Sequence, residues 1–144
     1  MSVLRVEPVQ TADEKIIDAC HRLIPQLSSS SQATTRSELE EIISSDATVM
    51  FAAQLGDDVV GLLTLAIFRI PTGVRAWIED VVVDESARGK GVGEALNQAA
   101  LAEAKRRGAK TVDLTSRPSR EAANRLYQRI GFVRRDTNVY RFDL

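Results

Sequence analysis

The spacing of apolar residues predicts helices and strands in alternation along the chain. A helix is indicated over residues 11–27, where apolar positions recur every three or four residues: Ile16, Ile17, Cys20, Leu23, Ile24 and Leu27. Thr11 or Asp13 is suited to cap its start, and Pro25 predicts a kink or an end late in the pattern. Thr35 or Thr34 is suited to cap a second helix, and Glu38 lies at capping-box spacing from Thr35.

Strand patterns follow, and the tight turns between them predict an antiparallel meander. A first strand is expected before the helices, at residues 3–8. The meander is expected after the helices, with strands at residues 48–55, 59–70 and 74–83. Gly61 lies inside the third of these stretches and predicts a bulge. The β-branched run Val81–Val83 is typical of a strand buried on both faces.

The second half of the chain continues the alternation. Its predicted elements are a helix over residues 92–107, a strand over 111–115, a helix over 119–130, and one or two strands over 132–135 and 138–143. A strand, a crossover helix and a strand in this order place the strand at 111–115 parallel to the one that ends at Val83. Ser119 is expected to cap the last helix and Gly131 to end it.

Composition limits the class of protein. The chain has 144 residues, 44% hydrophobic and 27% charged, which predicts a single globular domain over residues 1–144. A net charge of −1 argues against a nucleic-acid partner held by bulk charge. No apolar run approaches the roughly 20 residues that span a bilayer, so no membrane partner is expected. The one cysteine, Cys20, and the one histidine, His21, are too few for a zinc site, and a lone cysteine fits a reducing cytoplasm.

Charge is divided unevenly between the halves. Residues 1–83 hold 6 basic and 12 acidic residues, and residues 84–144 hold 13 basic and 8 acidic residues. An anionic ligand is therefore expected to favour the second half and a cationic substrate the first. An ordinary solvated surface explains the same asymmetry equally well.

A basic, glycine-rich turn joins the strand ending at Val83 to the helix beginning near residue 92. Its sequence over residues 88–93 is Arg-Gly-Lys-Gly-Val-Gly. Glycines let a ligand approach the backbone closely, and the first N–H groups of a helix lack internal partners. With the charges of Arg88 and Lys90, the turn predicts a site for a phosphate or pyrophosphate.

Two common phosphate motifs do not fit this turn. A P-loop ending at Gly89-Lys90 would need Gly at position 84 and Ser or Thr at position 91, which hold Asp and Gly. A dinucleotide fingerprint starting at Gly89 would need a small residue at position 94, which is Glu.

The turn does contain the pattern Arg-x-x-Gly-x-Gly, over residues 88–93. This pattern follows Val-x-Val-Asp over residues 81–84. This resembles the acetyl-CoA-binding motif of the GCN5-related N-acetyltransferase (GNAT) superfamily. A second block, residues 122–132, resembles the C-terminal motif of that family, with Asn, Leu-Tyr and Gly-Phe at the expected spacings. The resemblance implies an α/β fold with a mixed, mostly antiparallel sheet, flanked by about four helices and splayed at the acetyl-CoA-binding strand.

The resemblance also implies which residues bind acetyl-CoA. Main-chain groups of Val81, Val82 and Val83 would pair with the pantetheine arm, and Asn124 would hydrogen-bond near it. Tyr127 would lie by the sulfur and act as general acid, although its spacing also fits a core aromatic. The pyrophosphate would be held by the N–H groups of Arg88, Gly89, Lys90, Gly91, Val92, Gly93 and Glu94.

Transfer of an acetyl group to an amine requires a base, because the amine must lose a proton. Glu79 and Asp80 are adjacent carboxylates in an apolar strand, so regular alternation would direct them to opposite faces. In the family a glutamate on this strand often serves as base, directly or through water, which favours Glu79 over Asp80. A water relay to either carboxylate stays open. A salt bridge to Arg69 or Arg75 is the alternative for either carboxylate.

Together with the composition, the resemblance therefore implies a cytoplasmic, acetyl-CoA-dependent N-acetyltransferase that acts without a metal on a primary amine of a small molecule or peptide. The alternative is an acetyl-CoA-binding sensor without turnover, against which the presence of both Tyr127 and a strand carboxylate argues. Arg117 and Arg120 are candidates for the adenosine 3′-phosphate or plain surface residues. No motif identifies the acceptor, and the family leaves a homodimer open.

Overall fold

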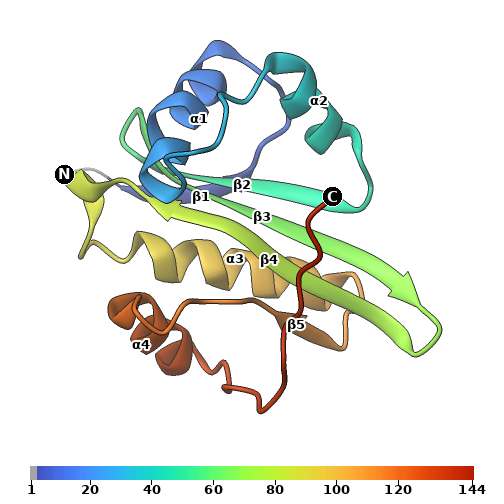
Figure 1. The fold of residues 1–144 in the computed structure, drawn as a ribbon. Helices are drawn as coiled ribbons and strands as arrows, with labels where there is room; N and C mark the ends of the chain where they lie inside the picture. The colour runs from blue at the N-terminus through green and yellow to red at the C-terminus, as the bar shows by residue number, and fades with distance from the viewer. Residues whose placement is uncertain (1–2) are drawn as a thin grey trace. The chain divides into compact units, whose positions relative to one another are not determined.

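The computed structural model describes residues 3–144 and divides into two compact units. The first unit is Met1–Leu114 and the second is Thr115–Leu144. Figure 1 shows the fold, and each unit is described by itself below.

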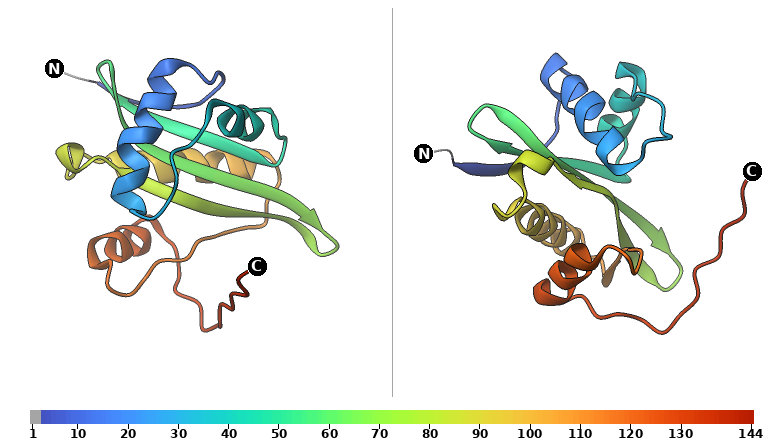
Figure 2. Two further views of the ribbon diagram at one scale, coloured as in Figure 1. Left: turned by 45° about the horizontal axis from the view of Figure 1, so that its top comes forward. Right: turned by 60° about the vertical axis from the view of Figure 1, so that its left-hand side comes forward.

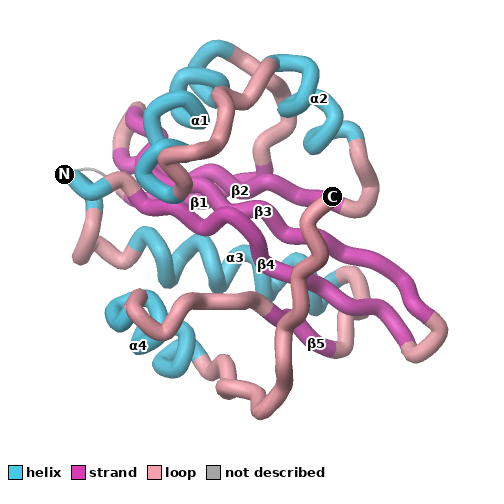
Figure 3. The backbone as a smooth tube through the Cα atoms, in the orientation of Figure 1, coloured by secondary structure: helices cyan, strands magenta, loops and turns pink. Residues whose placement is uncertain are grey.

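One five-stranded sheet forms the centre of the first unit (Figures 1 and 3). Its strands are β1 (Leu4–Pro8), β2 (Thr48–Leu55), β3 (Asp58–Ile70), β4 (Gly73–Val83) and β5 (Thr111–Asp113), in the spatial order β1-β2-β3-β4-β5. The first four strands pair antiparallel, and β5 pairs parallel to β4. The predicted meander, the parallel strand and the mixed α/β class are thus confirmed.

Helices cover both faces of this sheet (Figures 1 and 2). One face carries α1 (Glu14–Leu27) and α2 (Arg36–Ser44), and the other carries α3 (Val92–Arg106). Of the two predicted caps of α1, Asp13 is the actual one, since its carboxylate accepts the N–H of Ile16 at 3.0 Å. The capping box at residues 35–38 is confirmed. Within residues 3–144, no helix is long and apolar enough to cross a membrane.

Pro25 lies inside α1 without ending it. The helix continues to Leu27, and the N–H of Ser28 still donates to the carbonyl of Ile24 at 2.9 Å. The missing N–H of Pro25 therefore removes one helical hydrogen bond near the end of the helix, where the loss is tolerated.

A hydrophobic core fills the space between the sheet and the helices α1 and α2. Its buried members are Ile16, Ala19, Cys20, Leu23, Leu39, Met50, Ala52, Val59, Leu62 and Val82. Burial raises the pKa of the Cys20 thiol, which keeps it protonated at neutral pH. Cys20 is thus a small core residue, as its helical spacing indicated.

The bulge predicted at Gly61 is present. Ala53 lies opposite Gly61, and Gln54 lies opposite Val59, so Val60 is the extra residue in β3. A bulge at this point increases the local twist of the strand next to the start of α3.

The second unit contains one helix, α4 (Glu121–Ile130), and two predictions for it are wrong. Ser119 does not cap α4: the N-cap position is Arg120, without a side-chain cap bond. The side-chain amide of Asn124, a residue of α4, instead donates to the carbonyls of Arg117 and Arg120. A side chain of the helix therefore holds the turn that precedes it.

The strands predicted at residues 132–135 and 138–143 are not formed. Apolar residues in this segment are exposed: Val133, Val139, Tyr140, Phe142 and Leu144. Tyr140, Phe142 and Leu144 alternate as in a strand, but a strand needs a partner for its backbone groups. Apart from α4, the second unit offers no such partner.

Candidate functional site

The last part of β4 has one free edge. Strand β5 pairs only with Arg75–Trp77, so residues 78–83 of β4 have no strand beside them on that side within the described part of the first unit. The N–H of Asp84 donates to the carbonyl of Val60 on the β3 side, at 2.8 Å. Because backbone groups alternate along a strand, those of Val81 and Val83 turn toward the free edge. The sheet is thus splayed where the sequence predicted.

A bulge lies within this edge of β4. Glu79 lies opposite Thr64 and Val82 opposite Leu62, so Asp80 and Val81 share the place opposite one residue, Leu63. Asp80 has φ 51°, and no other non-glycine residue among those described has a positive φ. Aspartate is one of the few residue types that tolerate this left-handed conformation.

The bulge interrupts the regular alternation of β4 at the two carboxylates, Glu79 and Asp80. Both side chains are exposed. Neither forms an ion pair in residues 3–144, so the alternative of a salt bridge to Arg69 or Arg75 is not realised. The free edge of β4 therefore carries two carboxylates, Glu79 and Asp80, without an ion pair among the described residues.

The glycine-rich turn leads into α3 with the geometry of an anion site. Gly89 and Gly91 have φ of 79° and 78°, a conformation that glycine adopts without steric cost. Gly91 is the N-cap of α3, and no side chain of residues 3–144 caps the first N–H groups of the helix. A Cβ atom on either glycine would meet no atom within 4 Å, so the backbone is open on its outer side.

Charge at this turn favours an anion as well. The side chains of Arg88 and Lys90 are exposed, and the positive end of the α3 dipole lies at Val92. Val92 itself is buried with 1% of its surface exposed, so the helix start is fixed to the core. Glu94, also in the first turn, is half-buried.

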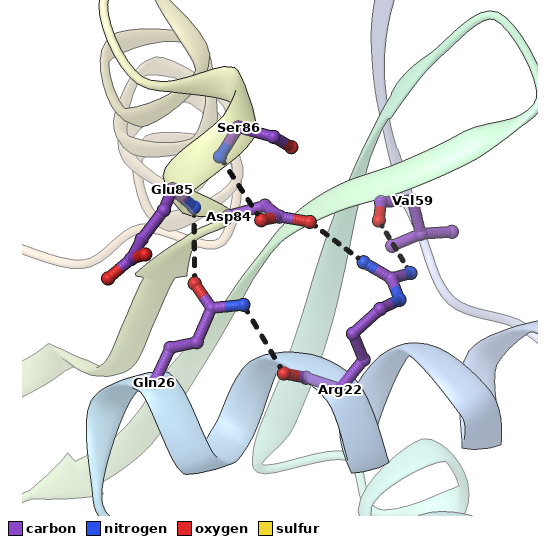
Figure 4. A network of polar contacts seen from close by, with 6 residues as sticks. All are labelled: Arg22, Gln26, Val59, Asp84, Glu85 and Ser86. Carbon is purple, nitrogen blue, oxygen red and sulfur yellow. Dashed lines mark hydrogen bonds and ion pairs between the residues drawn. The ribbon is translucent and has the colours of Figure 1, made fainter.

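The turn is connected to α1 by residues that no sequence pattern indicated (Figure 4). Arg22 donates to Asp84, and Gln26 accepts the N–H of Glu85. Arg22 and Asp84 are 62 residues apart, and Arg22 occupies an ordinary exposed position of an amphipathic helix. Only the folded structure reveals this connection.

In the second unit, the side chain of Asn124 is held in one orientation. Its Nδ2 donates to the carbonyls of Arg117 and Arg120, at 2.8 and 2.9 Å. Both amide hydrogens are thereby used, and Oδ1 is left as an acceptor. Asn124 can therefore accept a hydrogen bond from a ligand N–H group but has no free donor to offer.

Tyr127 is buried, with 7% of its surface exposed. Its ring makes an edge-to-face contact with Phe132, at a centroid distance of 5.8 Å. Burial raises the pKa of its phenol above the ordinary 10.0, although the charge of Arg120 lowers it in part. Tyr127 is thus a core aromatic whose hydroxyl stays protonated at neutral pH, which is the state that a general acid needs.

The predicted site residues therefore fall into two groups. Residues 79–94 are contiguous in the first unit, and Asn124 and Tyr127 belong to α4 in the second. A separate cavity of about 130 Å³ lies by β1 and the start of α1, and none of residues 79–94 lines it.

Similar proteins support this description of the fold. The fold matches that of a transcriptional regulator from Bacillus halodurans C-125, at 23% identity and a TM-score of 0.83, covering 99% of this chain and 100% of that one. Glucosamine-6-phosphate N-acetyltransferase from Arabidopsis thaliana matches at 20% identity and a TM-score of 0.81, over 97% and 98% of the two chains. An aminoglycoside N-acetyltransferase in complex with CoA matches at 17% identity and a TM-score of 0.83, over 99% and 96%.

Comparison by sequence gives a family. Among curated proteins, none matches the chain. The sequence model of the acetyltransferase (GNAT) family matches residues 16–132, which include both the glycine-rich turn and the block around Tyr127. The chain therefore belongs to the acetyltransferase (GNAT) family.

Proposed function

We propose that the protein transfers the acetyl group of acetyl-CoA to a primary amine of a small molecule or peptide. The observation that carries this proposal is the path from the free edge of β4 into the glycine-capped start of α3. Such a path offers amide-pairing groups and then an anion site, which suits the pantetheine arm and pyrophosphate of CoA. Family membership supports the same cosubstrate.

Binding is assigned to the residues predicted from the sequence. The backbone N–H groups of residues 89–94 hold the pyrophosphate, and Arg88 and Lys90 add charge. The N–H of Arg88 is a weaker candidate than predicted, because it donates to the carbonyl of Glu85 at 3.4 Å. The arm pairs along Val81–Val83, through the outward groups of Val81 and Val83, while the buried side chain of Val82 holds the strand to the core. Asn124 accepts a hydrogen bond through its free Oδ1.

The chemistry needs one base and one acid. When bound, acetyl-CoA supplies an activated acyl group on sulfur. Glu79 takes a proton from the attacking amine, directly or through water, and Asp80 is the alternative base. The amine nitrogen bonds to the acetyl carbonyl carbon, and the bond from that carbon to sulfur then breaks. Tyr127 donates its phenolic proton to the departing sulfur and regains one from solvent, to which Glu79 releases the proton of the amine. The phenol of Tyr127 is protonated at neutral pH, which this role requires.

We further propose that the two units act together as one acetyltransferase domain over residues 1–144. The match to the family extends over residues 16–132 and so includes most of the first unit and the α4 helix of the second. The residues assigned to binding and catalysis are likewise drawn from both units.

A sensor that binds acetyl-CoA without turnover is the second candidate, since one similar structure is named as a transcriptional regulator. The test is release of free CoA thiol from acetyl-CoA with a panel of amines. Thiol release that depends on an amine supports the transferase. Tight binding of CoA without turnover on any amine would favour the sensor, and no binding at all would exclude both.

A further inference from the structure

We propose that Arg22 and Gln26 of α1 are positioning residues for the acetyl-CoA-binding turn. They act through Asp84 and Glu85, which begin the segment between β4 and α3. This inference rests on the proposed function, because it assigns these residues a purpose in binding acetyl-CoA. It adds α1 to the elements that determine the shape of the cofactor site.

Arg22 joins three elements with one guanidinium group (Figure 4). Its Nη1 donates to Oδ2 of Asp84 at 3.0 Å, and its Nη2 donates to the carbonyl of Val59 in β3 at 3.0 Å. The planar guanidinium offers donors in a fixed fork, so both contacts fix the same group. Asp84 is therefore held at a set position relative to α1 and β3.

Asp84 also contacts the turn itself. Its Oδ1 accepts the N–H of Ser86 at 3.2 Å, which caps the short 3-10 helix η1 (Glu85–Ala87). Asp84 also follows Val83 directly, so it marks the point where the free edge of β4 ends. One carboxylate thus connects α1 to the strand end on one side and to the turn on the other.

Gln26 supplies a second contact one helical turn later. Its Oε1 accepts the N–H of Glu85 at 3.1 Å, and its Nε2 donates to the carbonyl of Arg22 at 3.3 Å. The bond to the Arg22 carbonyl orients the Gln26 amide, so that its oxygen faces η1. Arg22 and Gln26 therefore hold two successive residues of the segment that leads to Gly89 and Gly91.

The charges agree with this role. Partial burial of Asp84 raises its pKa, but the hydrogen bond from Ser86 and the charge of Arg22 outweigh it, and the pKa lies below its ordinary value. Asp84 keeps 18% of its side chain exposed and Arg22 keeps 47%. The contact is thus partly screened by solvent, so its loss is expected to loosen the turn and not to unfold the protein.

The experiment compares Arg22→Met, Gln26→Ala and the double variant with the wild type. Amide hydrogen exchange is measured at Glu85–Arg88 in the ligand-free protein, and the Kd for CoA and the KM for acetyl-CoA are measured in parallel. We expect exchange to accelerate about tenfold in the double variant, and CoA affinity to fall about three- to tenfold with kcat nearly unchanged. Arg22→Lys should restore part of the affinity, since lysine keeps the charge but not the fork.

Arg36→Met is the matched control. Arg36 forms an ion pair with Glu14 of α1 and is 49% exposed, but it has no contact with the turn. Its loss should leave both exchange at Glu85–Arg88 and CoA affinity unchanged. Unchanged exchange in the double variant would overturn the proposal whether or not the wild type binds CoA. Faster exchange with unchanged CoA affinity would overturn the positioning role, and failure of the wild type to bind CoA would count against the proposed function instead.

Discussion

Gly61 of β3 lies directly against Val92, the first residue of α3. A methyl group on Gly61 would stand 2.9 Å from Cγ1 of Val92, 2.9 Å from Cδ1 of Leu96 and 3.2 Å from the carbonyl oxygen of Val82. Val92 and Leu96 are buried, so neither can turn aside into solvent. The missing side chain at Gly61 therefore lets the start of α3 approach β3, which pairs with the strand whose edge forms the candidate site.

We predict that Gly61→Ala destabilises the protein and weakens CoA binding. The added methyl group must displace the start of α3, and overpacking of this kind costs about 1–3 kcal/mol. The same displacement moves the N–H groups that are proposed to hold the pyrophosphate. Urea unfolding and CoA titration measure the two effects. Wild-type values for both would show that α3 adapts without moving its N-terminus.

Substitutions of Asp80 test the bulge in β4. Asp80→Val should lower the free energy of unfolding by about 1–2 kcal/mol, because a β-branched residue resists the left-handed conformation. Asp80→Asn and Asp80→Gly should remain near wild-type stability, since both types adopt that conformation readily. Thermal or urea unfolding of the three variants checks this order. Equal stability of all three would mean that the bulge is not maintained in solution.

The order of the elements could be predicted because it depends on local patterns. The capping box at residues 35–38 and the turns around β3 involve neighbours in sequence, and Gly89 and Gly91 are identified by residue type alone. The bulge at Asp80 could not be predicted, because aspartate tolerates a positive φ without requiring it. The contact from Arg22 to Asp84 joins residues that are distant in sequence and carries no periodic signal.

The errors near the C-terminus have a related cause. The alternation of Tyr140, Phe142 and Leu144 is a valid strand pattern, but a pattern does not supply the neighbouring strand that its backbone needs. Ser119 is a good N-cap by type, yet the bonds from Asn124 to Arg117 and Arg120 decide where α4 begins. In both places, the hydrogen-bond partners that the fold supplies or lacks outweigh the preference of the residue type.

The identity of the base is tested by Glu79→Gln and Asp80→Asn. If Glu79 takes the proton from the amine, Glu79→Gln should lower kcat about a hundredfold, while Asp80→Asn keeps most of the activity. Both side chains are exposed and unpaired among the described residues, so neither change should alter stability appreciably. Steady-state kinetics with saturating acetyl-CoA decides between them. The reverse pattern would assign the base to Asp80. A small loss of kcat in both variants would favour a water molecule as the group that takes the proton.

Gly91→Val should weaken CoA binding strongly. The substitution places a β-branched residue at φ 78°, and its Cβ would project into the open space where the pyrophosphate is proposed to lie. Gly108→Val is the matched control, because Gly108 has φ 82° and equally open surroundings at the other end of α3. Both variants should lose stability, but only Gly91→Val should lose CoA affinity. Equal affinities in a CoA titration would contradict the assignment of the turn.

Tyr127→Phe tests the general acid. Loss of the phenolic proton should lower kcat about a hundredfold, with little change in CoA affinity because the ring and its contact with Phe132 remain. Single-turnover release of CoA thiol is the appropriate measurement. Near-wild-type turnover would remove Tyr127 from the mechanism and leave it as a core aromatic.

The pH dependence of stability checks the burial of the Tyr127 phenol without any ligand. Its pKa is raised in the folded state above the ordinary 10.0, so the folded protein holds this proton more tightly than the unfolded chain. The contribution of this phenol to the free energy of unfolding is fully present below pH 10.0, and it is lost as the pH rises through the folded-state pKa. Unfolding of the wild type and of Tyr127→Phe, compared from pH 8 to about 11, should therefore show the wild type losing more stability at the alkaline end. Parallel curves would mean that the phenol is solvated in solution, and its suitability as a buried proton donor would then lack support.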